Sequence, residues 1–161
     1  MDAKRRERVL VIVPCGRSKI WDKTPDAGPA LAQDAYNGTP FKLNRQYAEG
    51  VGTKWIILSA KFGFIFPEFT IAGPYEVTFK RKSTMPVSIA TLKQQICDLR
   101  LAEFQLVIGL GGKEYRAAVS QAFVGMNVEL QFPFAGLPVG KSMKATKDAI
   151  GEFHRKRIAT R

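Results

Sequence analysis

The sequence has few of the residues that build metal sites, disulfides or membrane spans. It contains 2 cysteines and 1 histidine among 161 residues, and no Cys-x-x-Cys pair, so neither a zinc site nor a disulfide framework is predicted. No apolar run approaches the roughly 18 residues that a transmembrane helix needs. The basic start MDAKRRER leads into a short apolar run rather than a signal-peptide core. We therefore expect a cytoplasmic protein with no metal, no cofactor and no membrane partner.

Acidic residues are also scarce compared with basic ones. The chain has 14 Asp and Glu against 25 Lys and Arg, which gives a formal net charge of +11. Basic residues gather at residues 4–8 and 80–82 and again between 141 and 157. Such an excess favours a polyanionic partner, most commonly nucleic acid, although basic segments are often only solvated. We expect DNA as the partner of a monomer or weak homodimer.

Apolar runs alternate with helical patterns along the chain. Four apolar runs predict buried parallel strands at residues 9–13, 55–58, 104–108 and 127–132. Helical patterns lie at about 41–49, 87–101, 114–123 and 142–158. Right-handed crossovers then predict an α/β fold, a three-layer αβα sandwich with a four-stranded parallel sheet in the order 2-1-3-4. A single domain over residues 1–161 is expected, with residues 1–7 as a basic tail.

The turn PCGRSK follows the first predicted strand. In open α/β sheets, ligands bind beyond the carboxyl ends of the strands where the strand order reverses, and that turn lies there. Cys15 is a candidate nucleophile, while Gly16 allows a ligand to approach the backbone. The spacing is not that of a P-loop. The alternative is a polar turn whose charges are only solvated.

Other loops at the same expected edge supply further candidates. Asp34 is the carboxylate that we expect to act as a general base or an electrostatic stabiliser, although a loop aspartate is more commonly only solvated. Loop aromatics can stack on a base or simply plug local gaps. The glycine-rich segment GLGGK and the later segment VGKS each open a predicted helix, where backbone N–H groups favour anions. Tyr115 is expected on the core face of the helix at 114–123.

Several stretches together resemble the YaaA-like (DUF6884-type) proteins, a family of unknown function with a CGxxK turn and an SAKYG motif. They are CGRSKIWD, DAYNGTPFKLNRQYAE, ILSAKFGF, GPYEVTF and GLPVGKSM. The family pattern falls on Cys15, Lys19, Asp34, Tyr36, Phe41, Ser59, Ala60, Lys61, Gly63, Pro74, Tyr75, Gly136, Gly140 and Lys141. Phe62 stands where tyrosine is more usual. The resemblance implies DNA binding and a role in oxidative stress.

The expected architecture is also similar to that of the uracil-DNA glycosylase superfamily. That likeness implies a flipped-out base and cleavage of its glycosidic bond. The chain departs from the superfamily because it has no Gly-x-Asp-Pro-Tyr after the first strand. It also has no histidine in the last turn, since its histidine is His154.

The favoured hypothesis is a nucleic-acid-binding enzyme, a DNA glycosylase that removes a modified or damaged base. A non-catalytic DNA-binding stress-response protein and a nucleoside- or nucleotide-processing enzyme remain open as alternatives. The catalytic candidates are Asp34, Cys15 and Lys19. The candidates for base contact are Gly16, Tyr36, Ser59, Phe62, Gly109 and Tyr75. The candidates for phosphate contact are Arg17, Ser18, Lys61, Lys113, Gly140, Lys141 and Ser142.

Overall fold

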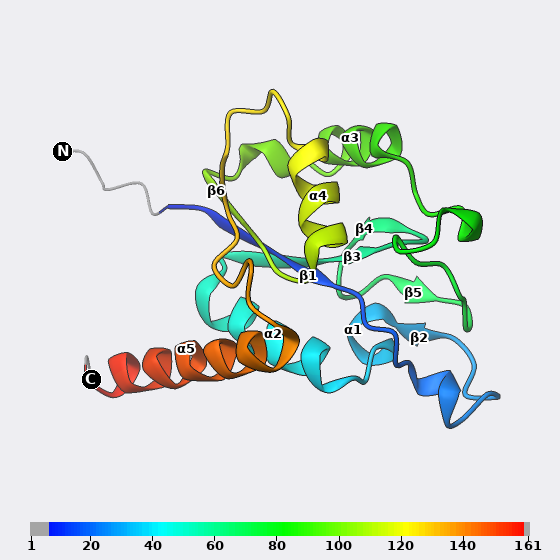
Figure 1. Cartoon of the computed structure of the whole chain (residues 1–161), viewed down its shortest axis with the longest axis horizontal. Coiled ribbons are helices and arrows are strands. Elements are labelled where there is room, and N and C mark those ends of the chain that lie inside the picture. Colours follow the sequence, from blue (N-terminus) through cyan, green and yellow to red (C-terminus); the bar gives the residue numbers. More distant parts are fainter. Residues whose placement is uncertain (1–6, 160–161) are drawn as a thin grey trace.

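A five-stranded sheet forms the centre of the molecule (Figure 1). The computed structural model describes residues 7–159. Its sheet strands are β1 (Val9–Pro14), β3 (Lys54–Ser59), β4 (Gly63–Ile65), β6 (Leu106–Gly109) and β7 (Glu129–Gln131). They lie in the order β4-β3-β1-β6-β7, with β1 in the middle.

The prediction of a purely parallel, four-stranded sheet was incomplete. β1 pairs in parallel with β3 and β6, and β6 pairs in parallel with β7, so these four strands keep the expected sequence of neighbours. β4 adds a fifth, antiparallel strand beside β3. It has three residues and begins at Gly63, so its pattern is too short to separate from the irregular stretch at 60–85 in which it lies.

Helices cover both faces of the sheet, as the sequence predicts. One face carries α2 (Thr39–Val51) and α5 (Val139–Ala159), and the other carries α3 (Ile89–Asp98) and α4 (Lys113–Ala122) (Figure 1). In β1, Val11 and Val13 belong to the apolar cluster on the α2 side, whereas Leu10 and Ile12 belong to the cluster on the α3 side. All four side chains are buried, because successive residues of a central strand face opposite layers.

Short elements organise the two long connections that the sequence leaves irregular. They are η1 (Ile20–Asp22), β2 (Ala30–Leu31), α1 (Ala32–Ala35), β5 (Thr70–Ile71) and η2 (Lys82–Thr84), while η3 (Leu101–Glu103) precedes β6. β2 and β5 form an antiparallel pair, so the connection after β1 is joined to the connection after β4. A hydrogen bond from the N–H of Ala32 to the carbonyl of Phe69 (2.7 Å) extends this link. Residues far apart in the chain thereby meet at one end of the sheet.

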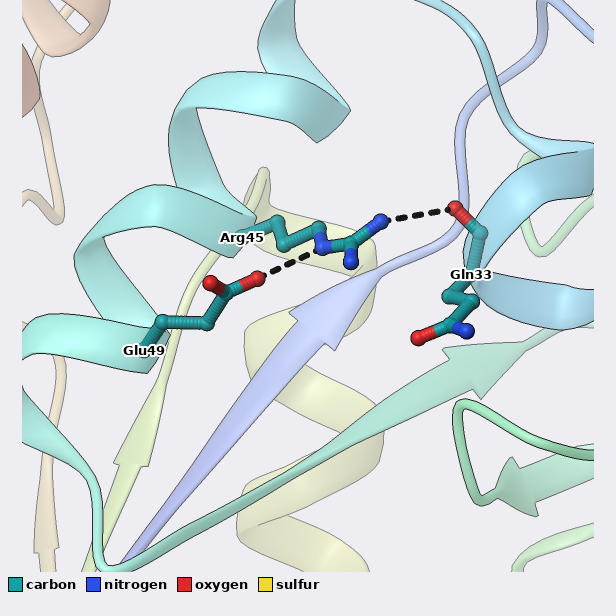
Figure 2. A network of polar contacts seen from close by, with 3 residues as sticks. All are labelled: Gln33, Arg45 and Glu49. Atoms are coloured by element: carbon teal, nitrogen blue, oxygen red, sulfur yellow. Dashed lines mark hydrogen bonds and ion pairs between the residues drawn. The ribbon is translucent and has the colours of Figure 1, made fainter.

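Arg45 on α2 links that helix to α1 through polar contacts (Figure 2). Its Nε donates to Oε1 of Glu49 at 2.6 Å, and its Nη1 donates to the carbonyl oxygen of Gln33 in α1 at 3.2 Å. The guanidinium also lies 5.5 Å from the ring centroid of Trp55 on β3. α1 directly precedes Tyr36, so this network helps to hold that tyrosine in place.

None of the helices in residues 7–159 combines the length and the apolar character that crossing a bilayer requires. The predicted basic tail at residues 1–7 lies, apart from Glu7, outside the described residues.

Candidate functional site

Cys15 lies where the connections after β1, β3 and β6 meet. It follows the last residue of β1, and its N–H donates to the carbonyl of Leu58 in β3 at 3.0 Å. Its Sγ lies 3.2 Å from the hydroxyl of Tyr115, on the helix that follows β6. The same hydroxyl lies 3.3 Å from the Cys15 carbonyl oxygen. The half-buried thiol therefore has a fixed position at the reversal of the strand order, the place that the sequence analysis indicates.

Three hydroxyl groups form a buried chain beside Cys15. The Ser59 Oγ lies 2.9 Å from the Tyr75 hydroxyl, which in turn lies 2.5 Å from the Tyr36 hydroxyl. The Ser59 Oγ also accepts the backbone N–H groups of Lys61 and Phe62, both at 3.2 Å. Ser59 is the last residue of β3, so the turn after that strand fixes one end of the chain.

The tyrosines of this region are hydrogen-bond donors rather than bases. Burial is the main cause that raises the pKa values of Tyr36, Tyr75 and Tyr115 well above the ordinary value of about 10. The next cause in each case is electrostatic repulsion from the thiolate form of Cys15, so all three phenols lie near its sulfur. The three phenols stay protonated at neutral pH.

Lys19 contributes a buried cation. Its Nζ donates to the Arg17 carbonyl at 3.2 Å and lies 4.6 Å from the Tyr75 ring centroid and 5.9 Å from that of Tyr36. The side chain of Asp22 accepts the backbone N–H of Lys19, at 2.9 Å, and not its ammonium group. Lys19 is 8% exposed and forms no ion pair with any residue in 7–159. A buried lysine without an acidic partner is uncommon in a protein interior.

Two of the three catalytic candidates, Cys15 and Lys19, belong to this group of side chains, which we call the tyrosine cluster: Cys15, Lys19, Tyr36, Ser59, Tyr75 and Tyr115. The third candidate, Asp34, is exposed on α1 and makes no hydrogen bond or ion pair within residues 7–159. Residues two apart in a helical turn do not share a side. Because Tyr36 faces the core, Asp34 two residues earlier faces solvent.

The base-contact candidates have different surroundings. Tyr36 and Tyr75 are buried, and their hydroxyls take part in hydrogen bonds within the protein, so neither ring presents a free face for stacking on a base. Phe62 is half-buried and packs edge-on against Tyr75 at 5.3 Å between ring centroids. Gly16 is half-buried, and a Cβ there would meet Phe41 at an ordinary 3.8 Å.

Gly109 has a packing role in β6. A Cβ at Gly109 would lie 2.6 Å from the ring of Phe132, so the glycine makes room for that ring. Phe132 packs against the apolar cluster on the α3 and α4 side of the sheet. Packing against Phe132 is therefore a sufficient reason for a glycine at position 109, and no contact with a ligand is needed to explain it.

The phosphate-contact candidates share exposure rather than mutual contact. Lys61 is the one whose side chain reaches the tyrosine cluster, with its Nζ 5.2 Å from the Phe62 centroid and 5.4 Å from that of Tyr75. The N–H of Ser142 donates to the Pro138 carbonyl at 2.8 Å in the first turn of α5. The others are exposed, and no contact brings them to Cys15: Arg17, Ser18, Lys113, Gly140 and Lys141.

Tyr115 is the functional candidate that the sequence analysis missed. Its position on the helical apolar face predicts a core residue, and Phe79 does pack edge-on against its ring at 5.3 Å. The hydroxyl, however, points to Cys15. The sequence did hold a signal for this role. Tyr115 lies in the first turn of α4, directly after the loop that follows β6, and that loop lies beside the end of β1 because the two strands are parallel neighbours.

A hollow of about 880 Å³ runs beside the edge strand β4. It is lined by aromatic rings and by a few polar groups: Thr53, Lys54, Trp55, Phe62, Phe64, Ile65, Phe66, Pro67, Glu68, Phe69, Gln95, Asp98 and Leu99. The Phe62 ring separates it from the tyrosine cluster, since that ring contacts both Tyr75 and Phe69 at 5.3 Å. We call this hollow the edge groove.

Comparison with known proteins identifies the family. A family model described as a family of unknown function (DUF6884) matches residues 10–148. The chain belongs to the DUF6884 family. It is 34% identical over 146 residues to the uncharacterized protein YfjM of Bacillus subtilis (strain 168), a match that covers 90% of this chain and 97% of YfjM.

A solved structure, that of AF0587, a protein of unknown function, is also similar. It shares 12% identity with a TM-score of 0.43 over 90% of this chain, which spans only 45% of the AF0587 chain. The family model and the match to YfjM confirm the family expected from the sequence motifs. The likeness to the uracil-DNA glycosylase superfamily stays a prediction.

In this DUF6884 protein, the motif positions divide into two groups. Those that the structure brings into or against the tyrosine cluster are Cys15, Lys19, Tyr36, Phe41, Ser59, Lys61 and Tyr75. Asp34 matches the same motifs but lies outside the cluster. The geometry therefore favours a thiol, an amine and phenols as the reactive groups, and not a carboxylate.

Proposed function

We propose that the protein is a nucleobase-processing enzyme in which Cys15 is the nucleophile. The base is presented within a nucleic acid or as a nucleotide. The observation that carries this proposal is the convergence of one fixed thiol, one unpaired buried ammonium and three protonated phenols on the reversal point of the sheet. A planar heterocycle with polar edges suits such a set of groups, because it offers both an electron-poor carbon and acceptor atoms.

The residues of the cluster divide the chemistry between them. The Cys15 sulfur adds to an electron-poor ring carbon, which is covalent catalysis by a thiolate. Phenol hydroxyls and the Lys19 ammonium stabilise the negative charge that then develops on the heterocycle. Within residues 7–159, neither a carboxylate nor the imidazole contacts Cys15, so its proton leaves to solvent or to the substrate.

The charge of the molecule supports a phosphate-bearing substrate. The formal net charge is +11, and the exposed Arg17, Lys61 and Lys113 form no ion pair with any residue in 7–159. Unpaired surface cations attract nucleic acid through counterion release. The same cations suit a mononucleotide, so the size of the substrate is part of the test below.

A second candidate is the DNA glycosylase of the sequence analysis. It is favoured by Lys19, a buried lysine with no carboxylate partner within residues 7–159. After its ammonium gives a proton to the departing base, the amine attacks the sugar carbon as the glycosidic bond breaks. This candidate receives no support from Asp34, which is exposed. In this candidate Lys19, and not Cys15, forms the covalent bond.

Intact-mass analysis distinguishes the two candidates. The protein is incubated with oligonucleotides carrying modified or deaminated bases and, separately, with the corresponding mononucleotides. The proposal predicts an adduct that maps to Cys15 and is absent in Cys15→Ser. The glycosylase predicts abasic sites revealed by alkali, and a borohydride-trapped adduct that is lost in Lys19→Met.

Cys97 supplies the matched control, since it is the other free thiol and lies exposed on α3. Cys97→Ser should behave like the unchanged protein. Salt-sensitive DNA binding with neither an adduct nor base release would contradict both enzymes and leave a binding protein.

A further inference from the structure

A turn at residues 78–85, which we call the basic turn, lies beside the tyrosine cluster and takes no part in the chemistry proposed above. It contains η2 and ends at Met85. The ring of Phe79, within the turn, packs edge-on against the Tyr115 ring at 5.3 Å between centroids. The Tyr115 hydroxyl in turn contacts Cys15. A single aromatic side chain, that of Tyr115, therefore links the basic turn to the thiol.

Hydrogen bonds fix the shape and the position of the basic turn. The Thr84 Oγ1 accepts the N–H of Thr78 at 3.1 Å and donates to the Arg81 carbonyl at 2.6 Å. The N–H of Arg81 donates to the Thr78 carbonyl at 3.3 Å. Just beyond the turn, the N–H of Val87 donates to the carbonyl of Ala60, in the connection that follows β3, at 2.7 Å. The turn is thus held against the same connections that build the tyrosine cluster.

Three consecutive cations lie on the basic turn: Lys80, Arg81 and Lys82. All three are exposed, and none forms an ion pair with any residue in 7–159. Unpaired surface cations bind phosphates and release the counterions that the phosphates had condensed. A fixed row of three such cations is therefore complementary to consecutive phosphates of a nucleic-acid backbone.

Met85, which follows these cations, is both exposed and strained. It is 85% exposed. Its backbone has φ +56° and ψ +59°, in the left-handed region that favours glycine. Glycine would relieve this strain and a polar residue would suit the exposure, so folding alone does not account for a methionine here. Strained residues cluster at functional sites, and methionine is among the apolar side chains that proteins insert between base steps.

We propose that the basic turn is an interaction surface for a nucleic-acid duplex, in which the three cations hold phosphates and Met85 inserts between neighbouring bases. This inference rests on the proposed function and deepens it, because it makes a nucleic acid, and not a free nucleotide, the form in which the base is presented. An anionic membrane would also attract the cations. One methionine, however, offers far less apolar surface than stable membrane anchoring requires.

The test uses a DNA duplex with a central mismatch next to a 2-aminopurine base, because a mismatch lowers the cost of unstacking. Binding of the unchanged protein should raise the 2-aminopurine fluorescence as the base unstacks. Binding constants measured over a range of salt concentrations then report the phosphate contacts. A triple variant, with Lys80, Arg81 and Lys82 all replaced by alanine, should lower the slope of log K against log salt by about 2–3. Lys80→Arg combined with Lys82→Arg keeps the charge and should keep the slope.

Variants of Met85 separate insertion from electrostatic binding. Met85→Ala should keep the salt slope but lose most of the fluorescence change, whereas Met85→Leu should keep both. Met85→Gly should also lose the fluorescence change while it raises the melting temperature, because glycine relieves the left-handed backbone. Val124→Ala is the matched control, since Val124 is 65% exposed beyond the C-terminal end of α4, outside the basic turn and the tyrosine cluster. It should change neither readout.

The results that overturn the inference differ from those that overturn the proposed function. An unchanged slope in the triple variant, or a full fluorescence change in Met85→Ala, contradicts the inference. So does binding to anionic lipid vesicles that the triple variant loses while it keeps DNA binding. An adduct at Cys15 from mononucleotides, without duplex binding, contradicts the inference and supports the proposed function. Duplex binding with the expected response to the variants, but with no adduct at Cys15, contradicts the proposed function and supports the basic turn as a nucleic-acid surface.

Discussion

Gln95 closes the exposed edge of the sheet, and replacing it with alanine should loosen that edge. Its Oε1 accepts the N–H of Phe64 at 2.8 Å, and its Nε2 donates to the carbonyl of Phe62 at 2.9 Å. A side-chain amide on α3 thus takes the place of a neighbouring strand along β4. Unpaired strand edges favour association with other chains, so the amide has both a stabilising and a protective role.

The magnitude follows from these two hydrogen bonds. Each contributes about 0.5–1.5 kcal/mol net, so Gln95→Ala should cost about 1–3 kcal/mol of unfolding free energy. For a protein of this size, the melting temperature should fall by about 2–12 °C. Gly63→Ala should also be destabilising, since Gly63 has φ +75° and a Cβ there would collide with the Gln95 amide.

Urea unfolding of matched variants is the assay. Gln94→Ala is the control, because the Gln94 amide on the same helix donates only to the exposed Asp98 carboxylate at 2.9 Å. It should change the free energy by about 0.5 kcal/mol or less. Gln95→Glu keeps an acceptor for Phe64 but loses the donor to Phe62, and should fall between the two. Equal stability of the Gln94 and Gln95 alanine variants would refute the reasoning.

Four further predictions concern packing and ionisation. Absorbance at 295 nm should show Tyr36, Tyr75 and Tyr115 un-ionised at pH 10–11 while the protein is folded, because burial raises their pKa values well above the ordinary value of about 10. The unfolded chain ionises near pH 10, so stability should be lost as pH rises above that value, and ionisation of more than one tyrosine below the unfolding transition would contradict this. Gly109→Ala should lower the melting temperature, since its Cβ would lie 2.6 Å from the Phe132 ring. Gly140→Ala, in the first turn of α5 with open space around it, should leave the melting temperature unchanged or raise it slightly. Arg45→Ala should cost about 1 kcal/mol by chemical denaturation, because its contacts to Glu49 and Gln33 are partly exposed.

The sequence allowed the parallel core of the fold to be predicted, and the reason is visible in β1 and β3. Strands apolar on both faces have few alternatives to a central position between two helical layers. β4, β2 and β5 were missed because strands of two or three residues carry no periodicity. Their formation depends on distant partners, such as Gln95 for β4.

The site was predictable in part for similar reasons. Cys15 directly follows β1 and Ser59 ends the neighbouring strand β3, so the topology alone brings them to one edge. Two features of the site could not be predicted: Asp34 is exposed, and the Tyr115 hydroxyl points toward Cys15. Both depend on which side of a helix faces the core at its first or last turn. Tertiary packing determines that side, and the spacing of residues along the chain does not.

Alkylation rates of the two cysteines, followed by mass spectrometry, test the central claim most directly. The account predicts that a bound nucleotide or oligonucleotide slows alkylation of Cys15, in the tyrosine cluster, and leaves that of Cys97, on α3, unchanged. Nucleobase ligands that bind but slow neither cysteine, or both equally, would contradict it.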